Sequence, residues 1–331
     1  MAHWVPSVVS ASLCFGLTIC YVARTDACAA VTVIPSWAWL VPGLFLAAFN
    51  LRGRENRKGW PVIAAWLIFL LVLVEEPWSL GRALLRPIRL ALEARPSGEA
   101  LRVISLNCAI GNRLAAEEVI RYRPDIVLLQ ESPGRSEVEE LARRLFGKEA
   151  GVVHGVDASL VVRGQVTPAE LPPAMRGYFV QARVRLATGR DIEVVSTRLL
   201  PAVFRADLWS PDCWRAQMQN RRSRREQLRV IAQRIGSISV PVIVGGDFNA
   251  PQGDAVFRLL RPKLHDAFTE GGLGWGDTII NSFPVLRIDQ IWVSDAIRAH
   301  AVVAQSTRNS DHRMVICDLS LGIDAAMPKD K

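Results

Sequence analysis

Three long apolar runs lie within the first part of the chain, and they constrain its fold more than any other feature. Residues 4–23 and 31–49 contain no charged side chain, and residues 60–74 form a shorter run of the same kind. A helix needs about 20 apolar residues to cross a bilayer, so the third run reaches that length only with its flanks. We therefore predict that residues 1–80 form a membrane anchor with about three transmembrane helices.

A cleavable signal peptide is the alternative interpretation of the first run. Such a peptide carries basic residues ahead of its apolar stretch, but only His3 precedes this one, and two further apolar runs follow. Several tryptophans also lie near the ends of the runs, where the interfacial aromatic belt of a membrane protein is expected. These observations favour an anchor.

The basic residues indicate how the anchor is oriented. Residues 50–59 carry four basic side chains against one acid, which the positive-inside rule places in the cytoplasm. With three spans, the rest of the chain would then lie on the outer, periplasmic or extracellular side. The arginines from Arg82 to Arg95 argue for the opposite orientation. We discount them because residues 81–100 have the pattern of an amphipathic juxtamembrane segment and linker, which can bind headgroups in either leaflet.

Residues 101–320 have the composition of a soluble domain. Short β-type runs such as residues 101–106, 125–129 and 240–244 alternate with helical patterns and with hairpins. This mixture predicts an α/β (α+β) four-layer sandwich, in which two packed mixed β-sheets are flanked by helices, rather than a doubly wound parallel sheet. Residues 321–331 are expected to form a tail.

The six cysteines show no spacing typical of a metal site. We interpret most of them as buried free thiols, which behave as small hydrophobic residues. A disulfide between Cys28 and Cys213 would require an oxidising compartment, and this pairing stays open.

Polar residues that can carry chemistry follow several of the predicted strands. Two short motifs contain most of them, Gly245-Gly246-Asp247-Phe248-Asn249 and Asn309-Ser310-Asp311-His312. Taken singly, each residue could be an ordinary turn residue, helix cap or ion-pair partner. Together they supply acids that hold a metal ion and activate water, amides that donate to an oxyanion, and an imidazole for the phosphorus centre. The set comprises Asn107, Glu131, Asp247, Asn249, Asp289, Asp311 and His312.

The order of these residues and their placement at strand ends resemble the endonuclease/exonuclease/phosphatase superfamily, over about residues 100–320. This group includes deoxyribonucleases, abasic-site endonucleases, inositol phosphatases and sphingomyelinases. The resemblance implies a Mg²⁺-dependent phosphoesterase, with Mn²⁺ as the alternative ion. It also implies that Asp289 is the carboxylate that holds the second ring nitrogen of His312.

The chemistry of the side chains suggests a role for each member of the set. A hard cation such as Mg²⁺ prefers oxygen ligands, so Glu131 is the best metal ligand, with Asn107 and Asp311 in support. Asp247 is placed to orient or deprotonate the attacking water. The amide of Asn249 can donate to a phosphate oxygen, and the imidazole of His312 can contact the phosphate. We therefore expect Asp247, Asn249, Asp289 and His312 to be catalytic, and Glu131, Asn107 and Asp311 to bind the metal ion.

One position departs from the family pattern. Family members commonly carry Asn-Thr-His-Leu at the end of a strand before a long helix, whereas this chain has Ser196-Thr197-Arg198-Leu199. Arg198 can bind phosphate oxygens, but it cannot act as an acid near neutral pH and it repels a close metal ion. We interpret Arg198 as a phosphate-binding residue that changes the rate or the substrate rather than as a sign of lost activity.

The sequence restricts the substrate only to a phosphoester. The net charge of +8 suits an anionic partner. Trp209, Trp214 and several arginines precede a helix predicted over residues 226–235, and they could line an anionic cleft or rest on lipid headgroups. We expect a nucleic acid or a phospholipid or sphingolipid headgroup as substrate, the membrane as a partner, and infer no protein partner. The alternative is a catalytically silent module on the same fold that binds a phosphorylated ligand or anionic lipid.

Overall fold

The computed structural model describes residues 5–48, 59–93, 100–203 and 205–322, and the chain divides into two compact units. The first unit comprises Met1–Trp78, Ala202–Ser223 and Gly253–Ala255, and the second comprises Ser79–Pro201, Arg224–Gln252 and Val256–Lys331. Most of the basic loop, most of the predicted linker and nearly all of the predicted tail (residues 49–58, 94–99 and 323–331) lie outside the described residues.

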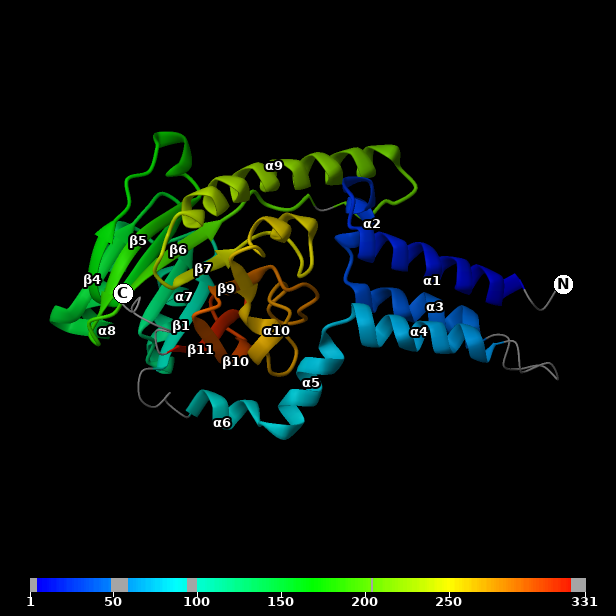
Figure 1. The fold of residues 1–331 in the computed structure, drawn as a ribbon, viewed down its shortest axis with the longest axis horizontal. Helices are drawn as coiled ribbons and strands as arrows, with labels where there is room; N and C mark the ends of the chain where they lie inside the picture. The colour runs from blue at the N-terminus through cyan, green and yellow to red at the C-terminus, as the bar shows by residue number, and fades with distance from the viewer. Residues whose placement is uncertain (1–4, 49–58, 94–99, 204, 323–331) are drawn as a thin grey trace, which may run out of the picture. The chain divides into compact units, whose positions relative to one another are not determined.

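The apolar part of the first unit consists of three helices that run alongside one another, α1 (Val5–Ala23), α3 (Leu40–Ala48) and α4 (Trp60–Leu73) (Figure 1). The indole of Trp66 on α4 is fully buried and donates to Ser10 Oγ on α1 at 2.9 Å. Ser10 in turn donates to the carbonyl of Gly43 on α3 at 2.7 Å. A chain of hydrogen bonds therefore crosses all three helices and satisfies polar groups that are buried among apolar residues.

The second apolar run does not form one continuous helix. It is divided into η1 (Asp26–Cys28), α2 (Ala29–Thr32), η2 (Ser36–Trp39) and α3. The break occurs at Pro35, because proline lacks a backbone N–H and disfavours the helical conformation of the residue before it. Among the described residues, α1 alone is long and apolar enough to cross a membrane, and up to three spans result if each of two bent helix pairs counts as one.

A later segment of the chain, residues 202–223, also belongs to the first unit. It contains the start of α9 (Pro211–Gly236), so the helix predicted over residues 226–235 begins 15 residues earlier. The guanidinium of Arg221 is buried and donates to Asp254 at 3.1 Å, to the carbonyl of Thr25 at 2.9 Å and to Thr32 Oγ1 at 2.5 Å. This buried cation thereby joins three parts of the unit that are distant in sequence.

The second unit is built on one curled mixed sheet whose strand order is β10-β11-β1-β2-β4-β5-β6-β7-β9-β8, with β3 paired to β4. The strands are β1 (Ala100–Asn107), β2 (Ile126–Gln130), β3 (Ala150–His154), β4 (Ala158–Pro168), β5 (Phe179–Leu186), β6 (Asp191–Arg198), β7 (Val242–Asp247), β8 (Leu264–Asp266), β9 (Asp289–Ser294), β10 (Ile297–Gln305) and β11 (Met314–Leu321). The helices that lie wholly or mostly in this unit are α5 (Glu76–Leu85), α6 (Ile88–Glu93), α7 (Arg113–Glu117), α8 (Arg135–Phe146), α10 (Ala267–Gly271), η5 (Glu118–Tyr122), η6 (Gly147–Glu149), η7 (Pro173–Met175) and η8 (Ala255–Leu259).

Strand β4 is where the sheet curls over. Its first half pairs with β2 and β3, and its second half pairs with β5 from Gly164 onwards. Gly164 has φ +147°, and a Cβ there would lie 2.4 Å from the carbonyl oxygen of Arg185, so only glycine fits. The two halves of the sheet then face each other across one apolar core, to which Leu128 and Val194 contribute from opposite sides.

Helices cover both outer faces of the curled sheet. Apolar residues of α7 and α8, such as Val138 and Leu141, pack on β1 and β2. The C-terminal part of α9 packs Leu228 and Ile231 on β6 and β7. The predicted architecture of two packed mixed sheets between helical layers is therefore confirmed, in the form of one sheet that folds back on itself.

The strand directions bring the predicted site residues to one edge. Strands β1 and β2 are parallel, with Asn107 opposite Gln130, and β6 and β7 are parallel, with Arg198 opposite Asp247. Strand β9 runs antiparallel to β7 and starts at Asp289, directly opposite Asp247.

Candidate active site

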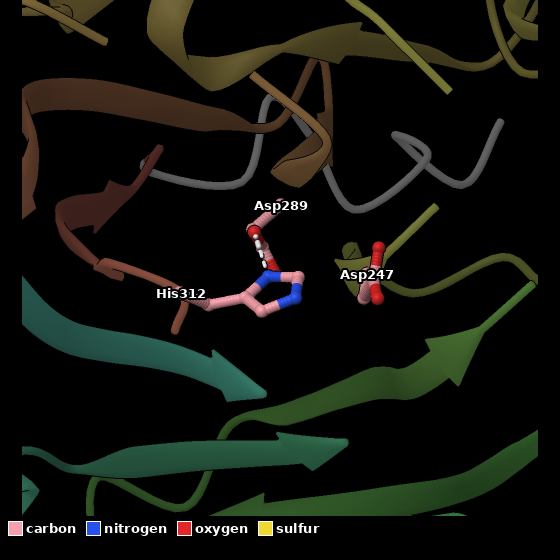
Figure 2. Close-up of side chains that lie close together, drawn as sticks. All are labelled: Asp247, Asp289 and His312. Carbon is pink, nitrogen blue, oxygen red and sulfur yellow. Dashed lines mark hydrogen bonds and ion pairs between the residues drawn. The ribbon is translucent and has the colours of Figure 1, made fainter. Parts of the chain in front are cut away.

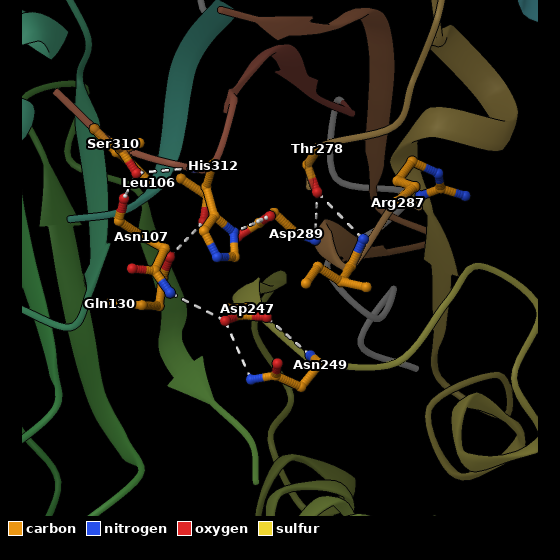
Figure 3. Close-up of polar contacts among 12 residues, drawn as sticks. Leu106, Asn107, Gln130, Asp247, Asn249, Thr278, Arg287, Asp289, Ser310 and His312 are labelled. Carbon is orange, nitrogen blue, oxygen red and sulfur yellow. Dashed lines mark hydrogen bonds and ion pairs between the residues drawn. The ribbon is translucent and has the colours of Figure 1, made fainter. Parts of the chain in front are cut away.

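Asp247 lies at the centre of the group of polar side chains at this edge. Its side chain is almost fully buried, and Oδ1 accepts a hydrogen bond from the backbone N–H of Asn249 at 2.9 Å. Oδ2 accepts from the amides of Asn107 and Asn249, each at 3.1 Å, as Figure 3 shows. Burial and the nearby charge of Asp289 raise the pKa of Asp247 to about 7, although His312, Asn249 and Asn107 act to lower it. This carboxyl group can therefore exchange a proton near neutral pH.

His312 and Asp289 form a buried pair beside Asp247. His312 Nδ1 lies 2.8 Å from Asp289 Oδ2, and Figure 2 shows the three side chains facing one another. Burial lowers the pKa of His312, but the charge and hydrogen bond of Asp289, together with Asp247 and Asp311, raise it to about 10. The imidazole is therefore a cation at neutral pH, and its Nδ1–H donates to Asp289.

The hydroxyl groups of Ser310 and Thr278, which are not among the predicted site residues, hold the His312–Asp289 pair in place. The backbone N–H of His312 donates to Ser310 Oγ at 3.0 Å, and Ser310 donates to the carbonyl of Asn107 at 2.7 Å. Thr278 Oγ1 accepts from the backbone N–H of Asp289 at 3.1 Å (Figure 3). Ser310 lies inside a motif that the sequence analysis identified, whereas no sequence signal marks Thr278.

Glu131, the predicted metal ligand, is held by three donors. Oε1 accepts from Asn107 Nδ2 at 3.1 Å and from Arg198 Nη2 at 2.8 Å, and Oε2 accepts from the backbone N–H of Ile110 at 2.6 Å. Burial raises the pKa of Glu131, but these hydrogen bonds and the positive charges of Arg198 and His312 hold it below its ordinary value. The residue has φ +43°, which places its side chain at a sharp turn directly after β2.

Arg198 bridges two carboxylates. Its Nη1 donates to Asp157 Oδ2 and its Nη2 to Glu131 Oε1, both at 2.8 Å, and its Nε lies 4.0 Å from Asp247 Oδ2. The Nε atom is buried and has no hydrogen-bond partner among the described residues. Asp157 was not predicted as a site residue, because it lies in a turn before β4 and belongs to no recognisable motif. The contact exists only because β4 and β6 are brought together by the curl of the sheet.

The remaining predicted residues are placed less centrally. Asp311 is exposed, and its carboxylate is near enough to raise the pKa of His312. Asn249 directs its amide at the carbonyl of Leu199 (2.9 Å) and at Asp247, so both amide hydrogens are in use. Donation from Asn249 to a phosphate would require it to leave one of these acceptors.

The donor set suits a hard divalent cation. Asp247, Asp289 and His312 present ligand atoms within 4.8 Å of one another, but the protonated imidazole of His312 has no lone pair for a cation, so the carboxylates are the donors in this group. Glu131 offers a separate carboxylate beside Asn107. Asp289 Oδ1 is buried without a hydrogen-bond partner among the described residues, which is costly unless a cation or water satisfies it. Oxygen donors of this kind are those that Mg²⁺ prefers. A cation bound to Glu131 Oε1 would have to displace Arg198 or share that oxygen with it.

Known proteins resemble this chain in sequence pattern and in fold. The model of the Endonuclease/Exonuclease/phosphatase family matches residues 104–312. A Bacteroides vulgatus endonuclease/exonuclease/phosphatase has a similar structure, with TM-score 0.53 and 18% identity, covering 68% of this chain and 100% of its own. A family member from Bacteroides thetaiotaomicron is also similar, with TM-score 0.54 and 15% identity, and the match covers 70% of this chain and 100% of that protein. A humanised D. rerio TDP2 is similar as well, with TM-score 0.50 and 20% identity, and the match covers 67% of this chain and 100% of that protein. No match was found among curated proteins.

Proposed function

This chain belongs to the endonuclease/exonuclease/phosphatase family and is a hydrolase of phosphoric esters, and we propose that it is a membrane-anchored, divalent-cation-dependent phosphoesterase. The observation that carries the proposal is the convergence of Asp247, of the His312–Asp289 pair and of Glu131 at one edge of the sheet. The reaction would be hydrolysis of a phosphodiester or phosphomonoester by attack of water.

Asp247 is the residue that we propose to orient and deprotonate the water. A pKa of about 7 leaves an appreciable fraction of the carboxylate ionised at neutral pH, while the proton that it accepts remains easy to release. The side-chain amides of Asn107 and Asn249 hold Oδ2 and the backbone N–H of Asn249 holds Oδ1, so the carboxylate is fixed in direction before substrate arrives.

His312 is the residue that we propose to meet the phosphate. Its Nδ1–H is directed at Asp289, so the other ring nitrogen is left to donate to a non-bridging oxygen. The positive charge opposes the negative charge that accumulates on the phosphoryl oxygens, and burial strengthens this interaction. Asp289 therefore has a positioning and charge-stabilising role rather than direct contact with substrate.

Glu131, Asn107 and Asp311 are the residues that we propose to hold Mg²⁺, or Mn²⁺ in its place. A bound divalent cation would supply Lewis-acid polarisation of the phosphoryl group. Arg198 takes the place at which family members commonly carry a histidine, and its planar guanidinium can bind two phosphate oxygens at once. In the structure the same guanidinium is paired to Glu131 and Asp157, so phosphate binding and the release of Glu131 would occur together.

The first unit supports the membrane part of the proposal. Helix α1 has 19 residues of mean hydropathy 1.8, and α4 has no charged residue over its 14 residues. We propose that these helices anchor the chain and that the hydrolase unit lies on the outer side, as the basic loop after α3 suggests. An anchored enzyme meets lipid headgroups at a high effective concentration, which keeps phospholipids and sphingolipids beside nucleic acids as candidate substrates.

A second function is favoured by one observation, the pairing of Arg198 with Glu131. If that pair never opens, the unit would bind a phosphorylated ligand or anionic lipid without turnover. Hydrolysis assays on the full chain in detergent separate the two functions. The substrates to be tested are plasmid DNA, sphingomyelin and a phosphoinositide, each with Mg²⁺ and with EDTA. Metal-dependent turnover of any of them supports the enzyme and identifies its substrate class, whereas binding without turnover supports the silent module.

A further inference from the structure

Helices α5 and α6 carry apolar residues on two opposite sides. One side is buried within the second unit, where Ala91 is almost fully covered and packs in a small cluster. The members of this cluster are Ala83, Ile88, Ala91, Leu92, Leu273, Ala301 and Val303. The segment is thus part of the hydrolase unit and has a defined inner face.

The other side of the two helices presents leucines to solvent. The side chains of Leu84 and Leu85 are 87% and 89% exposed, and those of Leu80 and Leu90 are 43% and 60% exposed. Two leucines exposed to this degree at adjacent positions are unusual in a soluble unit, and exposed apolar residues gathered on one short segment mark an interaction surface. We call these four residues the leucine face.

Two arginines fix the direction of the leucine face. Arg82 Nε donates to the carbonyl of Gly272 at 2.8 Å, and Arg86 Nη1 donates to the carbonyl of His300 at 2.7 Å. The sequence suggested that arginines of this segment bind lipid headgroups, but these two side chains are directed at backbone carbonyls of the hydrolase unit. Rotation of α5 that buried Leu84 or Leu85 would break these hydrogen bonds, so the leucines remain directed outward.

The connection to α4 limits how far the leucine face can lie from the apolar helices. Helix α4 ends at Leu73 and α5 begins at Glu76, a gap that spans at most about 11 Å when extended. Helix α5 itself, at ten residues, rises by about 15 Å. Leu84 and Leu85 therefore lie within about 25 Å of the end of α4 in any arrangement of the two units.

We propose that the leucine face inserts at the boundary between headgroups and acyl chains of the bilayer, an inference that rests on the proposed anchoring by the first unit. Amphipathic helices that lie in the plane of a membrane bury an apolar face in this way. Because Arg82 and Arg86 join α5 to the loop after α10 and to β10, the contact holds that side of the hydrolase unit against the bilayer. The enzyme then has a second, peripheral attachment besides its apolar helices.

Site-specific photo-crosslinking of the full chain in phosphatidylglycerol/phosphatidylcholine nanodiscs tests the proposal. The crosslinker p-benzoylphenylalanine replaces Leu84 or Leu85 in separate variants, and we expect both variants to fold because these side chains are exposed. Leu114, 58% exposed on α7, serves as the control within the same unit, and Phe15, 69% exposed on α1, serves as the control for anchoring. Mass spectrometry then reports whether the adduct is a lipid or protein.

We expect lipid adducts at Leu84 and Leu85 in several-fold higher yield than at Leu114, and at a level similar to Phe15. If the yield at Leu84 and Leu85 is no higher than at Leu114 while Phe15 gives lipid adducts, the proposed insertion of the leucine face is wrong. The proposed anchoring by the first unit is then still supported. Adducts to a second copy of the chain also overturn it. Absence of lipid adducts at Phe15 contradicts the proposed anchoring, and it therefore also contradicts the insertion of the leucine face, which rests on that anchoring.

Discussion

Arg198 and Asp157 are joined by a hydrogen bond of 2.8 Å between β6 and the turn before β4, and this pair sets the position of the guanidinium in the site. The other edge of the same guanidinium is bonded to Glu131 at 2.8 Å. The chain therefore carries a built-in cation at the carboxylate where the metal ion is proposed to bind.

Replacement of Arg198 by methionine should strengthen metal binding. The arginine competes with a cation for Glu131 Oε1, so its removal should raise the affinity for Mn²⁺ by about tenfold or more. Isothermal titration calorimetry with Mn²⁺ measures the affinity without reference to turnover. Asp157→Asn leaves Arg198 in place and is the matched control for loss of the second ion pair. Unchanged or weaker Mn²⁺ binding in Arg198→Met would show that the arginine does not compete.

Replacement of Asp289 by asparagine should neutralise His312 and slow hydrolysis. The amide keeps the shape of the side chain but removes the charge that holds the pKa of His312 near 10. Loss of one preorganised donor that stabilises charge in the transition state typically costs about 10²–10³-fold in rate. We expect a loss in this range in kcat, together with a clear downward shift of the His312 pKa in NMR titration. A normal rate with a shifted pKa would remove the imidazolium from the mechanism.

The metal-free protein should lose stability as pH rises. The pKa of His312 is raised from 6.5 to about 10, so between these values the folded state holds a proton that the unfolded chain has released. Stability from this group is fully present below about 6.5 and is lost as pH rises through about 10. Thermal unfolding in EDTA over this pH range measures the effect. His312→Gln should flatten the profile, whereas the exposed His300→Gln should leave it unchanged.

The buried ion pair of the first unit should be important for stability. Arg221 and Asp254 have side chains that are 1% and 2% exposed, and removal of one partner leaves the other charge buried. Breaking such a pair typically costs about 3–5 kcal/mol. Asp254→Asn should therefore lower the thermal unfolding midpoint in detergent markedly. Arg222→Gln removes a more exposed pair with Asp26 and should cost at most about 1 kcal/mol. Equal effects of the two changes would contradict this reasoning.

Strand-end residues were the part of the site that the sequence could predict. Asn107 and Asp247 each close an apolar run, and parallel strands bring such ends to one edge of a sheet. Asp157 could not be predicted, because its contact with Arg198 depends on the curl at Gly164. The sequence also shows no reason for Thr278 to lie under Asp289.

The helices were predicted less completely than the strands. The early start of α9 at Pro211 was missed, because its first half is polar and shows no simple apolar period. Arg221 within that half is buried and bonds to Asp254, Thr25 and Thr32, which are all remote in sequence. The outward direction of Leu84 and Leu85 likewise depends on distant carbonyl partners of Arg82 and Arg86.

The central claim is metal-dependent hydrolysis in which Asp247 takes part. Its most direct test is the rate of hydrolysis of bis(p-nitrophenyl) phosphate by the full chain in detergent, with Mg²⁺ and with EDTA, for the wild type, Asp247→Asn and Asp295→Asn. Asp295 has a side chain that is 98% exposed and lies outside the group of site residues, so it is the matched control. We predict turnover with Mg²⁺ that is abolished by EDTA, lost in Asp247→Asn by about 10²-fold or more, and unchanged in Asp295→Asn. Equal rates in the wild type and Asp247→Asn, or no turnover by a folded wild type that binds Mg²⁺, would contradict the account.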